Sequence, residues 1–99
     1  MDIIKSPSET YPLTVDYTDK LPDSTVITAG TATIYDFSND TDVTSTMKPG
    51  GITATATSLT MNIVAGTADK DYLLVVTATV TGSIPLVNYF RIRIKAPSL

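Results

Sequence analysis

The side chains that most often carry catalysis are missing from this 99-residue sequence. It has no histidine, the commonest general base, and no cysteine, so it lacks a thiol nucleophile and a thiolate metal site. Its only glutamate, Glu9, lies among the first ten residues, and no Gly-x-Ser-x-Gly or Gly-rich phosphate-binding motif is present. We therefore expect a protein that is not an enzyme and that holds no cofactor.

Acidic side chains are densest in the segment "DFSNDTD", where Asp36, Asp40 and Asp42 accompany Asn39. Calcium prefers several oxygen ligands from a flexible loop, so this segment offers a weak calcium site as one interpretation. The spacing is not that of an EF-hand, because the loop glycine and the distal glutamate are absent. The favoured interpretation is a solvated turn whose Asp and Asn side chains bind their own backbone. Asp69 and Asp71, on either side of a lysine, are assigned to a turn in the same way.

Basic side chains alternate near the carboxyl end, where Arg91, Arg93 and Lys95 share one face of an expected strand with Tyr89. The simplest interpretation is a solvent-facing surface whose charges discourage edge-to-edge strand pairing. The same four residues are also a possible interaction surface for a partner or a second copy of the chain. Nucleic acid is the least favoured ligand, because three basic residues are few and the net charge is −3.

The composition predicts one small β-domain. Threonine is the most frequent residue, hydrophobic residues make up 42%, and charged residues make up only 17%. β-branched side chains favour pleated strands, and no segment has helical apolar spacing free of Gly, Pro and Thr clusters. No apolar run is long enough to span a bilayer, and the first residues do not resemble a signal peptide, so we expect no membrane partner.

Apolar and polar residues alternate in short segments, which predicts about seven strands. The expected strands span residues 11–17, 26–37, 43–47, 52–57, 59–63, 72–81 and 87–95. Pro12 places the first strand at a sheet edge, Gly30 marks a bulge or break in the second, and Pro22-Asp23 turns the chain between them. The pattern predicts an all-β, seven-stranded immunoglobulin-like (or fibronectin type III-like) β-sandwich. Residues 1–10 are interpreted as a polar lead-in, and residues 11–99 as the single domain.

Tyr72 stands at the head of the longest clean strand, directly after a turn. It shares a face with Leu74 and Val76, so its ring is expected in the core. In immunoglobulin-type sandwiches a tyrosine at this corner binds the backbone a few residues upstream. We expect Tyr72 to be such a structural corner, with its hydroxyl satisfying a backbone carbonyl. The alternative is an ordinary amphipathic tyrosine that covers the end of the strand.

Three stretches resemble a set of short proteins of tailed bacteriophages and prophages. They are "LTVDYTDKLPDSTVITAGTATI" from Leu13 to Ile34, the later "GGITATATSLTMNIVAGTADKDYLLVVTATVTG", and the final "YFRIRIK". Proteins of that set are encoded among virion structural genes and are expected to be immunoglobulin-like. They often carry tryptophans near the positions of Tyr17 and Thr33, whereas this chain has none.

The resemblance implies a virion structural or accessory protein, assembled in the bacterial cytoplasm. Its implied partners are other virion proteins or further copies of itself. In isolation we expect a monomer or a weak oligomer, because contacts repeated in a symmetric particle can each be weak. The alternative is a bacterial surface or secreted module of the same fold that binds protein or carbohydrate, since this fold serves many functions.

Overall fold

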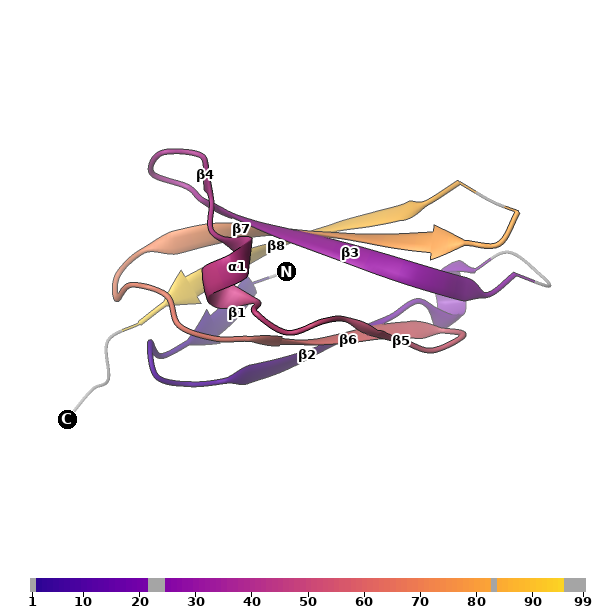
Figure 1. Cartoon of the computed structure of the whole chain (residues 1–99), viewed down its shortest axis with the longest axis horizontal. Coiled ribbons are helices and arrows are strands. Elements are labelled where there is room, and N and C mark those ends of the chain that lie inside the picture. Colours follow the sequence, from indigo (N-terminus) through magenta and orange to yellow (C-terminus); the bar gives the residue numbers. More distant parts are fainter. Residues whose placement is uncertain (1, 22–24, 83, 96–99) are drawn as a thin grey trace.

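The computed structural model of the chain describes residues 2–21, 25–82 and 84–95. Their strands form two sheets that lie as separate layers in Figure 1. The five-stranded sheet has the order β1-β8-β7-β3-β4, with strands Asp2–Lys5, Leu86–Ile94, Asp71–Val80, Ile27–Asp36 and Thr41–Asp42. The three-stranded sheet has the order β2-β6-β5, with strands Tyr11–Asp16, Ser58–Ile63 and Thr53–Ala54. Two short helices, η1 (Thr18–Lys20) and α1 (Thr44–Met47), complete the described elements. The all-β class and the two-sheet architecture predicted from the sequence are therefore confirmed.

The core lies between the sheets and is built from alternate residues of their strands. On β7, Tyr72, Leu74 and Val76 are buried, as the alternating pattern predicted. The other buried positions come mainly from three further strands, with Leu13 and Val15 on β2, Leu59, Met61 and Ile63 on β6, and Phe90, Ile92 and Ile94 on β8.

Residues 2–5 are not a polar lead-in, because they form β1, which pairs in parallel with Arg91–Ile94 of β8. Ile3 enters the core, and the Lys5 side chain, only 2% exposed, also points inward. Its ammonium group donates to the carbonyls of Ser6 (2.7 Å) and Ala65 (2.5 Å). Burial lowers the pKa of Lys5, with Glu9 acting in the opposite direction. The described chain consequently has eight strands, where the sequence predicted seven.

One of the expected strands was wrong, and another was wrong in part. Residues 43–47 do not form a strand, because the Asp42 carboxylate accepts from the Thr44 N–H and hydroxyl, and the chain then coils into α1. Residues 52–57 contribute only the two residues of β5. The Thr55 hydroxyl accepts from the Ser58 N–H (3.0 Å), which closes a turn directly after Ala54. Ala54 and Ala56 are therefore exposed, although small core positions were expected there.

The local irregularities of the strands follow the sequence signals. The pairing of β3 with β7 shifts between Ile27 and Ala29, which confirms the bulge expected beside Gly30. A Cβ on Gly30 would lie 2.6 Å from both terminal methyl carbons of Leu59, so the two sheets meet closely there. Pro12 lies on β2, an edge strand of the three-stranded sheet, as predicted. The turn expected at Pro22-Asp23 lies outside the described residues.

Candidate interaction surface

The basic stripe formed by Arg91, Arg93 and Lys95 lies on the outer face of the five-stranded sheet. Phe90, Ile92 and Ile94 of β8 are buried, so the residues between them point outward. Tyr89 is 63% exposed, and Arg91 and Lys95 are exposed as well. Over Arg91–Ile94, β8 has β1 on one side and β7 on the other. The two arginines are therefore inside the sheet rather than on its edge, and they face outward from it.

Asp71 binds Arg91 and lies near Arg93. It begins β7 directly opposite Arg93 and is not part of a plain turn. Its carboxylate accepts from two nitrogens of Arg91, one of them Nε at 3.1 Å, and lies 4.0 Å from Nε of Arg93. These hydrogen bonds raise the pKa of Arg91. Arg91 is thereby oriented, and part of the charge of the two arginines is neutralised.

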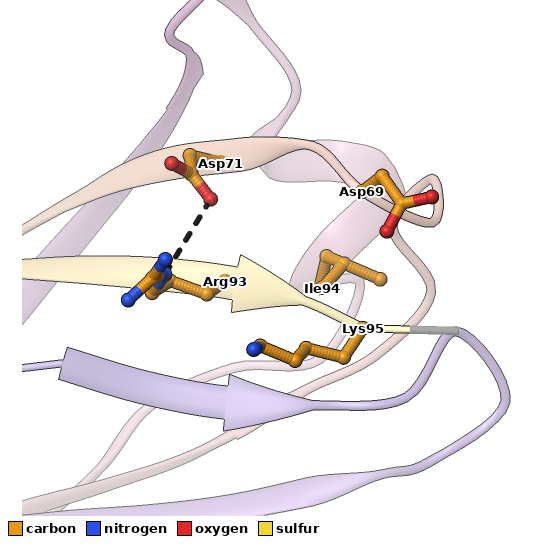
Figure 2. A pocket seen from close by; sticks show the side chains of 5 residues that line it. All are labelled: Asp69, Asp71, Arg93, Ile94 and Lys95. Carbon is orange, nitrogen blue, oxygen red and sulfur yellow. Dashed lines mark ion pairs between the residues drawn. The ribbon is translucent and has the colours of Figure 1, made fainter. Parts of the chain in front are cut away.

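A polar hollow of about 270 Å³ lies at the end of this face. Figure 2 shows the ion pair of Asp71 with Arg93 on one side of it, and Asp69 and Lys95 farther along. Asp69 adopts a positive φ of 65°, and its N–H donates to the carbonyl of Ile94 at the end of β8. Side chains of both signs therefore surround the hollow, so it has no single charge preference.

Apolar side chains that the sequence analysis overlooked accompany the charges on this face. Leu73 lies opposite Arg91, and Val75 lies opposite Tyr89, both half-buried on the outer side of β7. The guanidinium of Arg91 is 5.8 Å from the ring centre of Phe37, which is half-exposed. The run of four apolar residues beginning at Leu73 could have revealed these outward-facing side chains, because an uninterrupted apolar run places apolar residues on both faces of a strand.

The acidic segment binds its own backbone, as expected, but its first residue, Asp36, is buried at the end of β3 and is not solvated. The Asp36 carboxylate, on a residue only 6% exposed, accepts from the Ser38 N–H and hydroxyl and pairs with Lys70 at 2.9 Å. These contacts, that with Lys70 first, lower the pKa of Asp36 to about 2. The Asn39 side chain accepts from the Thr41 N–H, and Asp42 is engaged with the start of α1. In the part of the chain that the structure describes, no three acidic side chains cluster so as to hold a metal ion.

Tyr72 is buried at 4% exposure, and its hydroxyl binds backbone five residues upstream. The expected carbonyl partner was wrong, because the hydroxyl accepts from the Thr67 N–H at 3.0 Å. The hydrogen bond fixes the loop between β6 and β7 to the head of β7. Its position on the core side of the sheet separates Tyr72 from the outward-facing residues of β8.

Taken together, the fold and this face define a small all-β protein with a mixed aromatic and charged sheet surface. The family model described as podophage GP4 fiber-tail adaptor protein gp77 matches residues 5–93, and the chain belongs to that family. It is therefore a virion structural protein of a phage, as the sequence resemblance implied. A search of curated proteins finds no match. Among the described residues, no helix is both long and apolar enough to cross a membrane.

Proposed function

We propose that this chain is a non-enzymatic adaptor that joins a fibre protein to the phage tail. The observation that carries the proposal is the family match over residues 5–93, whose description is a fiber-tail adaptor. The partners are other virion proteins, with self-association as a weaker contact, and neither nucleic acid nor a membrane takes part. The chain is made and assembled into the virion in the bacterial cytoplasm.

The contact surface in this proposal is the outer face of the five-stranded sheet, centred on Tyr89 with Arg91, Arg93 and Lys95. An exposed tyrosine supplies a large, rigid contact area, and Tyr and Arg are enriched among residues that dominate binding energy. Because Asp71 already orients Arg91, less side-chain entropy is lost when a partner binds. A face with fixed charges around an aromatic residue favours a specific orientation of its partner.

The sandwich in this proposal is of the immunoglobulin-like type. Three contacts support that assignment, namely the parallel pairing of β1 with β8, the antiparallel pairing of β8, β7 and β3, and the Tyr72 hydrogen bond to the upstream loop. The domain in this proposal begins near residue 2, and the pairing of β1 with β8 supports that boundary.

The test is a phage from which the gene for this chain is deleted, supplied with the protein from a plasmid. We expect particles with tails but without attached fibres when the chain is absent, and restored fibres when the wild type is supplied. Tyr89→Ala should restore few fibres, whereas Asn62→Ala, an exposed position on the other sheet, should act as the wild type does. Fibres attached in the absence of the chain would overturn the adaptor role.

A further inference from the structure

Part of β8 has an open edge. β1 pairs only with Arg91–Ile94, so no described strand lies beside Leu86–Phe90 on that side. On the β7 side, the Ile94 N–H donates to the Lys70 carbonyl, and the Ile94 carbonyl accepts from the Asp69 N–H. On the β1 side, the N–H of Lys95, which follows β8, donates to the Lys5 carbonyl. The pairing of β7 with β8 continues without a register shift, and backbone groups alternate in direction along a strand. The N–H and C=O groups of Val87 and Tyr89 therefore point toward the open edge.

This edge lacks the features by which other edges of the sandwich avoid strand pairing. β2 carries Pro12, and β4 and β5 are only two residues long. β1 has a charged residue at each end. The segment Leu86–Phe90 reads "LVNYF", with no charge, proline or glycine. The charges of β8 begin at Arg91, where β1 already covers the strand.

A hollow of about 470 Å³ adjoins the open edge and separates it from the facing edge of the other sheet. Thr14 and Val15 of β2 line one side with Lys20, and Asn88, Tyr89 and Phe90 line the other. Val15 and Phe90 are core residues that are each 7% exposed, so they supply an apolar lining. Asp16 also borders the hollow, and its carboxylate accepts hydrogen bonds from the N–H and the hydroxyl of Thr18.

We propose that this edge accepts an extended, uncharged segment of another virion protein as an added strand in line with β1. The inference rests on the proposed adaptor function and names the contact by which a partner is held. Backbone groups of Val87 and Tyr89 bind the segment, and one of its apolar side chains covers Val15 and Phe90. The open segment Leu86–Phe90 admits an added strand of at most about five residues, or roughly 17 Å.

The proposed adaptor role favours a different virion protein as the occupant, because an adaptor must hold a protein other than itself. A second copy offers only its own Leu86–Phe90, since β1 already covers Arg91–Ile94 of its β8, and pairing of two such open edges is the alternative that the crosslinking test decides. The four-residue β1 of that copy is already paired with its own β8.

The first test places a benzophenone amino acid at position 88, which lines the hollow, in the chain carried by intact virions. Irradiation followed by mass spectrometry should show a crosslink to one segment of another virion protein. The same amino acid at position 54, an exposed site on β5, is the control and should not give that crosslink. Crosslinks only to further copies of this chain, or none above the control, would overturn the proposal.

The second test compares Val87→Pro with Val87→Thr in the deletion phage. Proline at position 87 removes an N–H that points away from β7, so the pairing of β8 with β7 is retained. Threonine keeps this N–H and only replaces one methyl group of the valine side chain by a hydroxyl. Thermal unfolding of each purified variant verifies the fold. Val87→Pro should reduce incorporation into virions by about tenfold or more, which corresponds to about 1.4 kcal/mol, and Val87→Thr should have little effect.

The two proposals fail in different ways. If Val87→Pro and Val87→Thr reduce incorporation into virions equally, the partner recognises the outer face and not the backbone edge. Normal incorporation of a folded Val87→Pro chain would also reject the added strand. If fibres attach without the chain but the crosslink at position 88 persists, the adaptor role is wrong while the strand-accepting edge stands.

Discussion

Two buried tyrosines offer a matched test of the hydrogen-bond assignments. The Tyr72 hydroxyl accepts from the Thr67 N–H at 3.0 Å, whereas the Tyr17 hydroxyl is buried without a partner in the described part of the chain. Both rings belong to the core, with exposures of 4% for Tyr72 and 1% for Tyr17. Replacement by phenylalanine removes only the hydroxyl in each case, so packing of the ring is preserved.

The expected changes in stability differ in sign. An intramolecular hydrogen bond contributes about 0.5–1.5 kcal/mol net, and a buried group left without a partner costs about 1–3 kcal/mol. The Thr67 hydrogen bond is only partly buried, so the lower range applies. Tyr72→Phe should reduce the free energy of unfolding by about 1 kcal/mol, or about 4–8 °C in Tm. Tyr17→Phe should leave it unchanged or raise it by up to about 1 kcal/mol, because an unpaired hydroxyl is no longer buried.

Urea unfolding of the wild type and the two variants, followed by circular dichroism, measures these differences. An unchanged slope with denaturant shows that only stability is altered. If Tyr72→Phe changes the free energy by no more than a few tenths of a kcal/mol, the Thr67 hydrogen bond does not stabilise the fold. If Tyr17→Phe loses as much as Tyr72→Phe, its hydroxyl has a partner and the contrast is wrong.

Three further expectations concern other parts of the molecule. The pKa of Asp36, about 2, lies below its ordinary 3.8, so its stabilisation is present above about pH 4 and lost as the pH falls toward 2. Asp36→Asn should flatten that pH dependence in urea titrations, and an unaltered profile would refute it. Gly30→Ala should cost about 1–3 kcal/mol through overpacking against Leu59, while Gly50→Ala, with open space around it, should be nearly neutral by thermal unfolding. Light scattering should find a monomer or weak oligomer that dissociates as salt rises, more readily in Arg91→Glu/Arg93→Glu; a salt-insensitive oligomer unaffected by these changes would contradict it.

The strands that could be predicted from the sequence are those with one buried face. On β2, β6, β7 and β8 the alternation of apolar and polar residues is governed by the core, so both the strand and its inward residues follow from the pattern. The outward direction of Tyr89, Arg91 and Arg93 follows in the same way. Gly30 also marked its bulge, because a glycine inside a strand pattern signals a local irregularity or a close approach.

The errors arose where a contact distant in sequence overrides the local pattern. From the sequence, Lys5 resembles an ordinary solvent-facing charge. In the structure its ammonium group donates to the carbonyl of Ala65, sixty residues away. The coil of α1 depends on a side-chain hydrogen bond from Thr44 to Asp42, which competes with strand pairing. Asp71 reaches the arginines only because the register of β7 with β8 places it opposite Arg93 and diagonal to Arg91, and no local pattern reveals that register.

The most direct test of the adaptor role is a density map of the intact virion at a resolution that traces side chains. We predict this sandwich at the junction between tail and fibre, with the outer face around Tyr89, Arg91, Arg93 and Lys95 covered by a partner protein. A sandwich found elsewhere in the particle, or one at the junction with this face open to solvent, would contradict the account.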